Sequence, residues 1–439
     1  MPQNQHQNNE YYGVIGQIEA DLGFATLTAI PAYRHAHLDY YNVLSFAFAN
    51  NETDDQYSLE MRLTSKASGR FRWIVGGFGL EDKVHSATVT DNFNGSGTRP
   101  TFDQTTKSWA IFADGTFDIV PGLRALGGIR YTEDKKTATG LQTNLAGTGG
   151  FIALNGDRKF TATNFRAGLQ YDVTPSTMVY ATYATGYHAG GFFFANLVNP
   201  GDTNTYNPER IKAITLGVKS KLLDNRLTID LEAFRWKLTD QQATLTTVDV
   251  FGNLYFKTLN AGNALNQGIE LDAQFRPVRN TMLGAKISYL DAKFEQFAYV
   301  QAIPVQPQFA CTATGVAPVI TVDCGGKRPP QAPEWSINLN AEQTIEMGGG
   351  SNLVVGATAH YQSTTLVGFN YLADDYQAPV WTEDAQITFN PDGKRWSVGA
   401  FVTNLTDRTV KMNASHNGNV QAFQLRPPRV IGARASFNF

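Results

Sequence analysis

The sequence predicts an all-β protein, and three observations support this prediction. Apolar and polar residues alternate along many segments, as in the last ten residues, VIGARASFNF, where Ile431, Phe437 and Phe439 share one parity and Arg434 has the other. No comparable segment repeats its apolar residues at helical spacing. Short and long connections take turns between these segments. Because successive side chains of a strand point to opposite faces, each segment is expected to form a strand with one apolar and one polar face.

The alternation recurs along the chain, and each occurrence predicts a strand. In YSLEMRLTSK, Leu59, Met61 and Leu63 alternate with Glu60 and Arg62. The further segments with this pattern are 164–173, 226–233, 266–275, 335–342 and 353–361. A first strand is expected near residues 14–21, followed by a sharp turn near Gly23.

The connections between the predicted strands fall into two classes. The short ones are 66–70, 118–122, 172–176, 222–225, 276–280, 347–351 and 391–394, and they carry the Gly, Pro, Asn and Asp residues that tight turns need. The long ones cover about residues 35–54, 84–104, 137–158, 188–208, 241–254, 298–332, 366–379 and 406–427. Because the two classes alternate, all short turns are expected at one end of a sheet and all long loops at the other.

This asymmetry is typical of a transmembrane antiparallel β-barrel, with short periplasmic turns, long extracellular loops and strands that face lipid and lumen in turn. Charged side chains on the polar faces would remain hydrated in a water-filled lumen, so placing them there costs little free energy. They are Glu60, Arg62, Arg166, Asp230, Glu232, Glu270, Asp272 and Arg434. Aromatic residues near strand ends suit interfacial girdles: Tyr33, Trp73, Trp109, Phe117, Tyr131, Tyr187, Trp236 and Trp381. The alternative is a soluble sandwich, propeller or solenoid, in which a second sheet covers the apolar faces.

Composition narrows the function classes. The chain has 439 residues, a net charge of −3 and only 17% charged residues, which predicts no broad basic surface for nucleic acid. No segment approaches the ~18 consecutive apolar residues of a membrane helix. The start, MPQNQHQNNEYYG, lacks the basic end and apolar core of a signal peptide.

The pattern predicts about 17 strands. The first and last strands both run from the long-loop end to the short-turn end, so a barrel with both termini in the periplasm would need at least one more strand upstream. We therefore expect residues 1–439 to be a single, partial barrel domain.

Several segments together resemble the C-terminal part of the barrel of a TonB-dependent outer-membrane receptor. They include MVYATYATGYHAGGF, NPERIKAITLGVKSKLLDNRLTIDLEAFRWKLTDQQ, RPPQAPEWSINLNAEQ and FVTNLTDR. The resemblance implies a barrel of about 22 strands around an N-terminal plug, so the plug and the first strands are expected to be missing here. It also implies a multi-pass location in the outer membrane of a Gram-negative bacterium.

The stretch TGYHAGGFFF ends a predicted strand and enters a long loop. Its aromatic residues could grip an apolar or aromatic ligand at the outer mouth, or could serve in a girdle or in loop packing. The candidates are Tyr187, His188, Phe192, Phe193 and Phe194, and His416 in the loop before the last strand has similar standing. His35 and His37 share one side of a strand end, which alone is a weak signal for metal.

Two cysteines, Cys311 and Cys324, lie in one long loop with no others in the chain. This arrangement favours a local disulfide in an oxidising compartment, with two free thiols as the alternative. The stapled loop 298–332 could contact a ligand or a phage, or have no binding role. Without nearby histidines or further cysteines, zinc is not expected.

No motif for a hydrolase, a metalloprotease or a phosphate loop is present, so we expect neither an enzyme nor a cofactor or metal site. The resemblance implies active uptake of a scarce, bulky solute such as a ferric siderophore, cobalamin or an oligosaccharide, energised by the TonB complex. The alternatives are a passive porin, an outer-membrane enzyme and a surface receptor or adhesin. The other expected partners are outer-membrane lipid, lipopolysaccharide and the barrel-assembly machinery, for which Phe437 and Phe439 resemble the recognition signal. We expect a monomer.

Overall fold

The computed structural model describes residues 5–43, 47–66, 69–91, 97–149, 152–193, 204–248, 254–302, 310–316, 319–417 and 420–437. In these ranges nearly every element is a strand, and the helices are two short 3-10 turns, η1 (Ala373–Asp375) and η2 (Asp392–Lys394). None of the helices in the described ranges is long and apolar enough to cross a membrane. The all-β prediction is confirmed.

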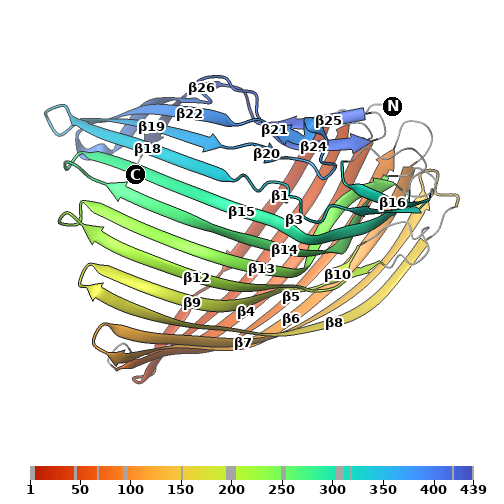
Figure 1. Ribbon diagram of the computed structural model, residues 1–439, viewed down its shortest axis with the longest axis horizontal. Coiled ribbons are helices and arrows are strands. Elements are labelled where there is room, and N and C mark those ends of the chain that lie inside the picture. Colours follow the sequence, from red (N-terminus) through yellow and green to blue (C-terminus); the bar gives the residue numbers. More distant parts are fainter. Residues whose placement is uncertain are drawn as a thin grey trace.

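One antiparallel sheet forms the body of the molecule (Figure 1). Its first strand is interrupted, because β1 (His6–Ile15) and β2 (Ile18–Asp21) both pair with the next strand. The strands that follow in order around the sheet are β3 (Ala25–Val43), β4 (Ala47–Ser65), β5 (Phe71–Asp91), β6 (Gly97–Val120), β7 (Leu123–Asn144), β8 (Ile152–Thr174), β9 (Thr177–His188), β12 (Glu209–Leu222), β13 (Leu227–Val248), β14 (Leu254–Phe275), β15 (Thr281–Ala302), β18 (Trp335–Glu346), β19 (Asn352–Gln362), β22 (Val380–Asn390), β23 (Trp396–Thr403) and β26 (Val430–Phe437).

The strand count agrees with the sequence. Of the 20 strands in the sheet, β16 (Thr312–Val316) and β17 (Val319–Asp323) form a hairpin at one end, and β1 and β2 are parts of one strand, which leaves 17 in the wall. In Figure 1 the sheet curls round, with β3–β6 behind and β9–β15 in front. Within the described ranges, β1–β2 pairs only with β3 and β26 only with β23.

The short turns gather at one end of the sheet, on the left of Figure 1, and the long connections at the other. The predicted sharp turn at Gly23 is present: this glycine has a φ of 83°, and the Leu22 amide donates to the Ala25 carbonyl at 2.9 Å. A positive φ is accessible to glycine at little cost. In transmembrane β-barrels the end with the long connections is the extracellular one.

The strands are longer than the sequence suggested, and four of the predicted long loops are mostly strand. Residues 35–54, 84–104, 137–158 and 241–254 continue the ladder for most of their length, so that β6 and β8 reach 24 and 23 residues. These segments are rich in Thr, Asn and Asp. Because mostly small and polar residues occupy both faces there, the alternation of apolar and polar residues disappears although the backbone pairing continues.

The alternation separates an outer from an inner face. Ile111, Ile129 and Phe165 follow one another across β6, β7 and β8, and they are 59%, 55% and 47% exposed, as side chains facing lipid would be. The apolar band ends with Trp109 and Tyr131, whose ring centroids are 5.4 Å apart. These two aromatics fit the predicted girdle.

Two residues assigned to the girdle from sequence do not fit it. Trp236 has the parity of Glu232, which is an inner-face position, and it packs on Phe234 with ring centroids 4.5 Å apart. Tyr187 reaches the inner-face residue Asp134. An aromatic residue near a strand end is therefore an insufficient signal by itself, because the parity and the local wall geometry decide which way its ring points.

Candidate functional site

Three long connections meet at the extracellular end above β15, β18 and β19. The first contains the hairpin β16–β17, in which β17 also pairs with the end of β15. The second contains β20 (Thr365–Leu366), η1 and β21 (Tyr376–Gln377). The third contains the hairpin β24 (Lys411–Asn417) and β25 (Val420–Leu425). We call these the mouth loops.

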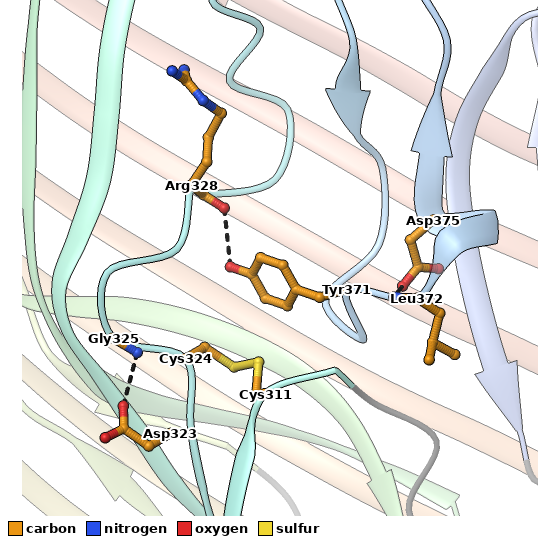
Figure 2. Close-up of a disulfide and its surroundings, with 8 residues drawn as sticks. All are labelled: Cys311, Asp323, Cys324, Gly325, Arg328, Tyr371, Leu372 and Asp375. Atoms are coloured by element: carbon orange, nitrogen blue, oxygen red, sulfur yellow. Dashed lines mark hydrogen bonds between the residues drawn. A yellow bond between two sulfur atoms is a disulfide. The ribbon is translucent and has the colours of Figure 1, made fainter.

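A disulfide joins Cys311, just before β16, to Cys324, just after β17, with a Cα–Cα distance of 5.0 Å. It closes the base of the hairpin (Figure 2). The next turn is held by the Gly325 amide, which donates to Asp323 Oδ1 at 2.8 Å. The hairpin is thus fixed at the point where the chain leaves it towards β18.

A hydrophobic cluster supports the mouth loops, and we call it the mouth core. Its buried members are Leu245, Ala264, Phe294, Phe297, Ile320, Val322, Cys324, Leu366 and Tyr371. Phe294 and Phe297 stack with centroids 4.2 Å apart, and Phe369 lies 6.2 Å from Phe297. The core therefore joins β13–β15 of the wall to the first and second loops, and its burial of apolar area stabilises a defined loop conformation.

Hydrogen bonds tie the three mouth loops to one another. The Tyr371 hydroxyl donates to the Arg328 carbonyl at 3.0 Å, which links the second loop to the first (Figure 2). The Ala414 amide donates to the Val367 carbonyl at 3.0 Å, which links the third loop to the second. The Gln331 amide group donates to the Met412 carbonyl at 2.7 Å.

A cavity of about 410 Å³ lies between the first two loops, and we call it the mouth pocket. Its lining residues are Lys327, Arg328, Glu334, Ser363, Thr364, Leu366, Tyr371, Tyr376 and Pro379. The lining combines two cations, one carboxylate, two side-chain hydroxyls of Ser and Thr, and two tyrosines. This combination can bind an anionic ligand with an aromatic or apolar body.

The cations of the mouth pocket are held in place. Lys327 Nζ lies 5.2 Å from the ring centroid of Tyr371, within the range of a cation–π interaction. Arg328 Nη1 donates to the carbonyls of Leu290 and Ala332 at 3.0 and 3.1 Å. Burial raises the pKa of the Tyr371 hydroxyl, so this group stays neutral and remains a donor.

The aromatic stretch singled out from sequence lies elsewhere, where β9 separates from β8. The Tyr187 hydroxyl donates to Asp134 Oδ2 at 3.1 Å, and burial raises its pKa. His188 is exposed and stands opposite Glu209 in the register of β12. Phe192 and Phe193 are only 7% and 8% exposed, and Phe194 lies outside the described residues.

Phe192 packs against the wall. Its ring lies directly over Gly156 of β8, where any side chain would collide with it. Gly190 similarly faces the ring of Phe160, itself buried. These contacts favour loop packing over ligand contact as the role of Phe192, which was one of the alternatives left open by the sequence.

The remaining sequence candidates lie apart from the mouth pocket or outside the described part. His416 belongs to β24 opposite Gln421, and its side chain lies outside the described part. Phe437 ends β26 and is 68% exposed, while Phe439 lies outside the described residues. His35 Nδ1 is 2.8 Å from Asp55 Oδ1, and the described residues contain no group of three or more metal-binding side chains.

The inner wall below the mouth is polar and internally paired. Lys219 pairs with Asp230 at 2.6 Å, Lys286 with Asp272 at 3.2 Å, and the Tyr180 hydroxyl donates to Glu232 at 2.7 Å. A second cavity of about 350 Å³ lies against these residues, and Glu270 and Asn338 also line it. These wall charges are therefore part of local pairs, with an excess of carboxylates facing the lumen.

Sequence reasoning had marked the long loop 298–332 but missed the particular residues of the mouth pocket. Lys327, Arg328 and Tyr371 carry no local pattern that distinguishes them from other polar loop residues. They become neighbours only because the disulfide and the mouth core fold two separate loops together. The cysteine pair was the one signal in the sequence that pointed to this region.

A curled antiparallel wall with an apolar outer band, a polar lumen and structured loops at one end defines an outer-membrane β-barrel protein. The chain belongs to the family described as TonB dependent receptor-like, beta-barrel, whose model matches residues 2–405. The family is one of receptors located in the Gram-negative outer membrane, not of enzymes, in agreement with the expectations from sequence.

Solved structures show the same fold at low sequence identity. The ferric yersiniabactin uptake receptor FyuA from Yersinia pestis has a TM-score of 0.79 and 16% identity, and the match covers 100% of this chain and 63% of that one. The siderophore receptor PiuA from Acinetobacter baumannii gives 0.76 and 18%, with 98% and 64% covered. The ferric-catecholate import receptor Fiu from E. coli K12 gives 0.72 and 16%, with 99% and 65% covered. The chain thus spans less than two thirds of the length of these receptors.

Proposed function

We propose that the chain forms the wall and the extracellular ligand site of a receptor that takes up an anionic metal chelate, of the ferric siderophore class, across the outer membrane. In the whole protein, TonB would supply the energy. The observation that carries the proposal is the mouth pocket, in which Lys327 and Arg328 lie beside Tyr371 and Tyr376. The similarity in fold to the ferric yersiniabactin uptake receptor FyuA and the siderophore receptor PiuA supports the proposal by analogy.

The chemistry of the pocket suits such a ligand. Chelates that bind ferric iron through several anionic oxygens are bulky and commonly carry net negative charge. A lysine ammonium and an arginine guanidinium can form charge-assisted hydrogen bonds with those oxygens. The exposed ring of Tyr376, which is 39% accessible, offers a surface for the organic part of the ligand. Because the disulfide and mouth core hold these groups in place, little ordering is required on binding.

Uptake by the native gene tests the proposal. A strain that lacks the gene and other iron receptors should take up an iron-55 siderophore complex only when the native gene is restored. Lys327→Gln should raise the Kd of that complex about tenfold, equivalent to ~1.4 kcal/mol. Lys83→Gln is the matched control, because Lys83 is an exposed lysine paired with Glu81 at 3.3 Å on the outer face and should leave the Kd unchanged.

Two outcomes would contradict the proposal. One is normal affinity in Lys327→Gln together with normal surface expression of the protein. The other is no chelate uptake by the native gene with any ferric siderophore of a panel that covers catecholate, hydroxamate and carboxylate ligands. Uptake of the chelate that persists after TonB is removed would contradict the energy source alone.

A further inference from the structure

The mouth pocket contains one acidic side chain beside its two cations, and this carboxylate changes what the pocket can bind. The charged residues of the lining are Lys327, Arg328 and Glu334. Two cations and one carboxylate give the lining a net charge of +1. The Lys327 ammonium lies over the ring of Tyr371 and forms no ion pair in the described part of the chain. Glu334 therefore halves the positive charge that Lys327 and Arg328 would present by themselves.

The backbone holds Glu334 beside Arg328. The Glu334 carbonyl accepts a hydrogen bond from the Leu290 amide at 2.8 Å, and Arg328 Nη1 donates to the carbonyl of the same Leu290 at 3.0 Å. Glu334 Oε2 lies 3.9 Å from Arg328 Nη2, which is within ion-pair distance but too far for a hydrogen bond. The Glu334 side chain is 51% exposed. Its negative charge therefore acts on a ligand in the pocket as well as on Arg328.

The next charged groups belong to the second and third mouth loops and do not line the pocket. The Lys411 ammonium donates to the carbonyls of Asp374 and Tyr376 at 2.8 and 3.5 Å. Asp374 and Asp375 place two carboxylates in the same loop segment, η1. The charge that a ligand meets directly is therefore set by the three charged residues of the lining.

The charge of a ligand affects its binding free energy in two opposing ways. The attraction to the lining grows in proportion to the ligand charge, whereas the free energy of removing that charge from water grows with its square. A lining of charge +1 can neutralise one negative charge. Further negative charges would be desolvated without partners. The best match is thus a ligand with a single net negative charge.

We propose that Glu334 is a specificity-determining residue that restricts the mouth pocket to metal chelates with a single net negative charge and disfavours those with three. The inference rests on the proposed function and deepens it. Three catecholates around one ferric ion leave three negative charges, because six phenolate oxygens surround one Fe³⁺. Two hydroxamates and one α-hydroxycarboxylate leave only one. The expected ligand class is therefore a mixed hydroxamate–carboxylate chelate, and Glu334 supplies the repulsion that excludes the more highly charged class.

Binding of matched chelates tests this charge preference. Two tripodal chelators share one scaffold, and one carries three catecholates while the other carries two hydroxamates and one α-hydroxycarboxylate. Each is loaded with iron-55, and its Kd is measured on cells that express the native gene but lack TonB, so that binding is read without transport. The singly charged complex should bind the wild type about tenfold more tightly than the triply charged one.

Glu334→Gln should weaken this preference. Because Coulomb energy scales with the charge of the ligand, the Kd should fall about twofold for the singly charged complex and about tenfold for the triply charged one. The preference then shrinks from about tenfold to about twofold. Glu81→Gln is the matched control, because it removes a carboxylate that pairs with Lys83 at 3.3 Å on the outer face of β5. It should leave both Kd values unchanged.

Two results would overturn the inference and leave the proposed function standing, because a chelate would still bind. One is equal or tighter binding of the triply charged complex by the wild type. The other is an unchanged preference in Glu334→Gln with normal surface expression. If neither complex bound, and no ferric siderophore of the wider panel bound either, the proposed function itself would be contradicted and this inference with it.

Discussion

The two sides of the wall reach the extracellular space by different means. Strands β3–β8 are 19 to 24 residues long, whereas β18, β19, β22, β23 and β26 have only 8 to 12. On the long-strand side, the backbone ladder itself continues beyond the apolar band. On the short-strand side, the ladder stops and the mouth loops take over. The part of the wall beyond the apolar band is therefore built from paired strands on one side and from loops on the other.

The difference lies in what stabilises each part. A ladder satisfies its backbone groups regardless of the side chains, so the long-strand side can carry mainly polar residues on both faces. The mouth loops have fewer regular backbone pairs, and they depend on the mouth core and the disulfide instead. A ligand pocket benefits from the second solution, because loops can place side chains from distant positions around one cavity.

The largest expected effect comes from Phe297→Ala in the mouth core. Phe297 is 1% exposed, and truncation of a buried phenylalanine costs about 3–5 kcal/mol. We expect this loss to appear as local opening of the mouth loops and not as unfolding of the wall. Hydrogen exchange should speed up strongly at residues 319–323 and remain unchanged at 132–140.

Phe165→Ala provides the control for this experiment. Phe165 is 47% exposed on the outer face of β8, so its truncation leaves no cavity in the mouth core. Exchange in β17 should stay as in the wild type. If Phe297→Ala accelerated exchange in β7 as much as in β17, the two sides would be one cooperative unit and the comparison would fail.

A somewhat smaller effect is expected on breaking the disulfide. Cys311 and Cys324 are 13 positions apart, and a loop of about this length gains roughly 3 kcal/mol from cross-linking. Since the chain has no other cysteines, a reductant acts at this bond alone. We expect reduction, or Cys311→Ala/Cys324→Ala, to make residues 310–316 and 319–334 sensitive to protease and to weaken ligand binding. Unchanged protease resistance after verified reduction would show that the mouth core suffices.

The sequence predicts part of this difference between the long-strand and short-strand sides, and which part depends on the environment of each segment. The 17 wall strands are predictable, because Leu59, Met61 and Leu63 and their equivalents face lipid while their neighbours face water. The extensions of those strands are not, because segments such as 137–144 place mainly small or polar residues on both faces, the buried Ala138 and Gln142 included, and so lose the apolar–polar period of two. Their pairing is imposed by the neighbouring strands.

The residues of the mouth pocket follow from the sequence less directly than the wall strands do, because they come from separate loops. The cysteine pair marks the loop that contributes Lys327 and Arg328 to the mouth pocket, whereas Phe192 of the aromatic stretch packs on Gly156. Aromatic residues occur both in buried packing and in ligand contacts, and only the surrounding fold shows which of the two roles a given aromatic residue has. Tyr371 and Lys327 are 44 positions apart in sequence yet form a cation–π pair, and no local pattern predicts such a meeting.

The smallest expected effect concerns the long-strand side and depends on pH. Asp54 lies on the inner face of β4, beyond the apolar outer band that begins at Tyr57, and burial, followed by the nearby Asp82 carboxyl, raises its pKa to about 6. The folded strand end therefore binds this proton more tightly than the open one. Its stability should be highest below pH ~4, fall as the pH rises towards 6, and stay constant above that value.

Asp54→Asn should abolish this dependence, because the amide cannot ionise. At pH 7 we expect slower hydrogen exchange in residues 50–56 and 80–86, corresponding to about 1–2 kcal/mol of added local stability. Asp103→Asn is the matched control, since Asp103 is exposed and lies 2.7 Å from His85 on the outer face. Hydrogen exchange in the mouth loops should not change with either substitution, because several strands of the wall separate Asp54 from the mouth core. Faster exchange in Asp54→Asn at pH 7 would mean that the Asp54 carboxylate stabilises this part of β4, and it would contradict the prediction.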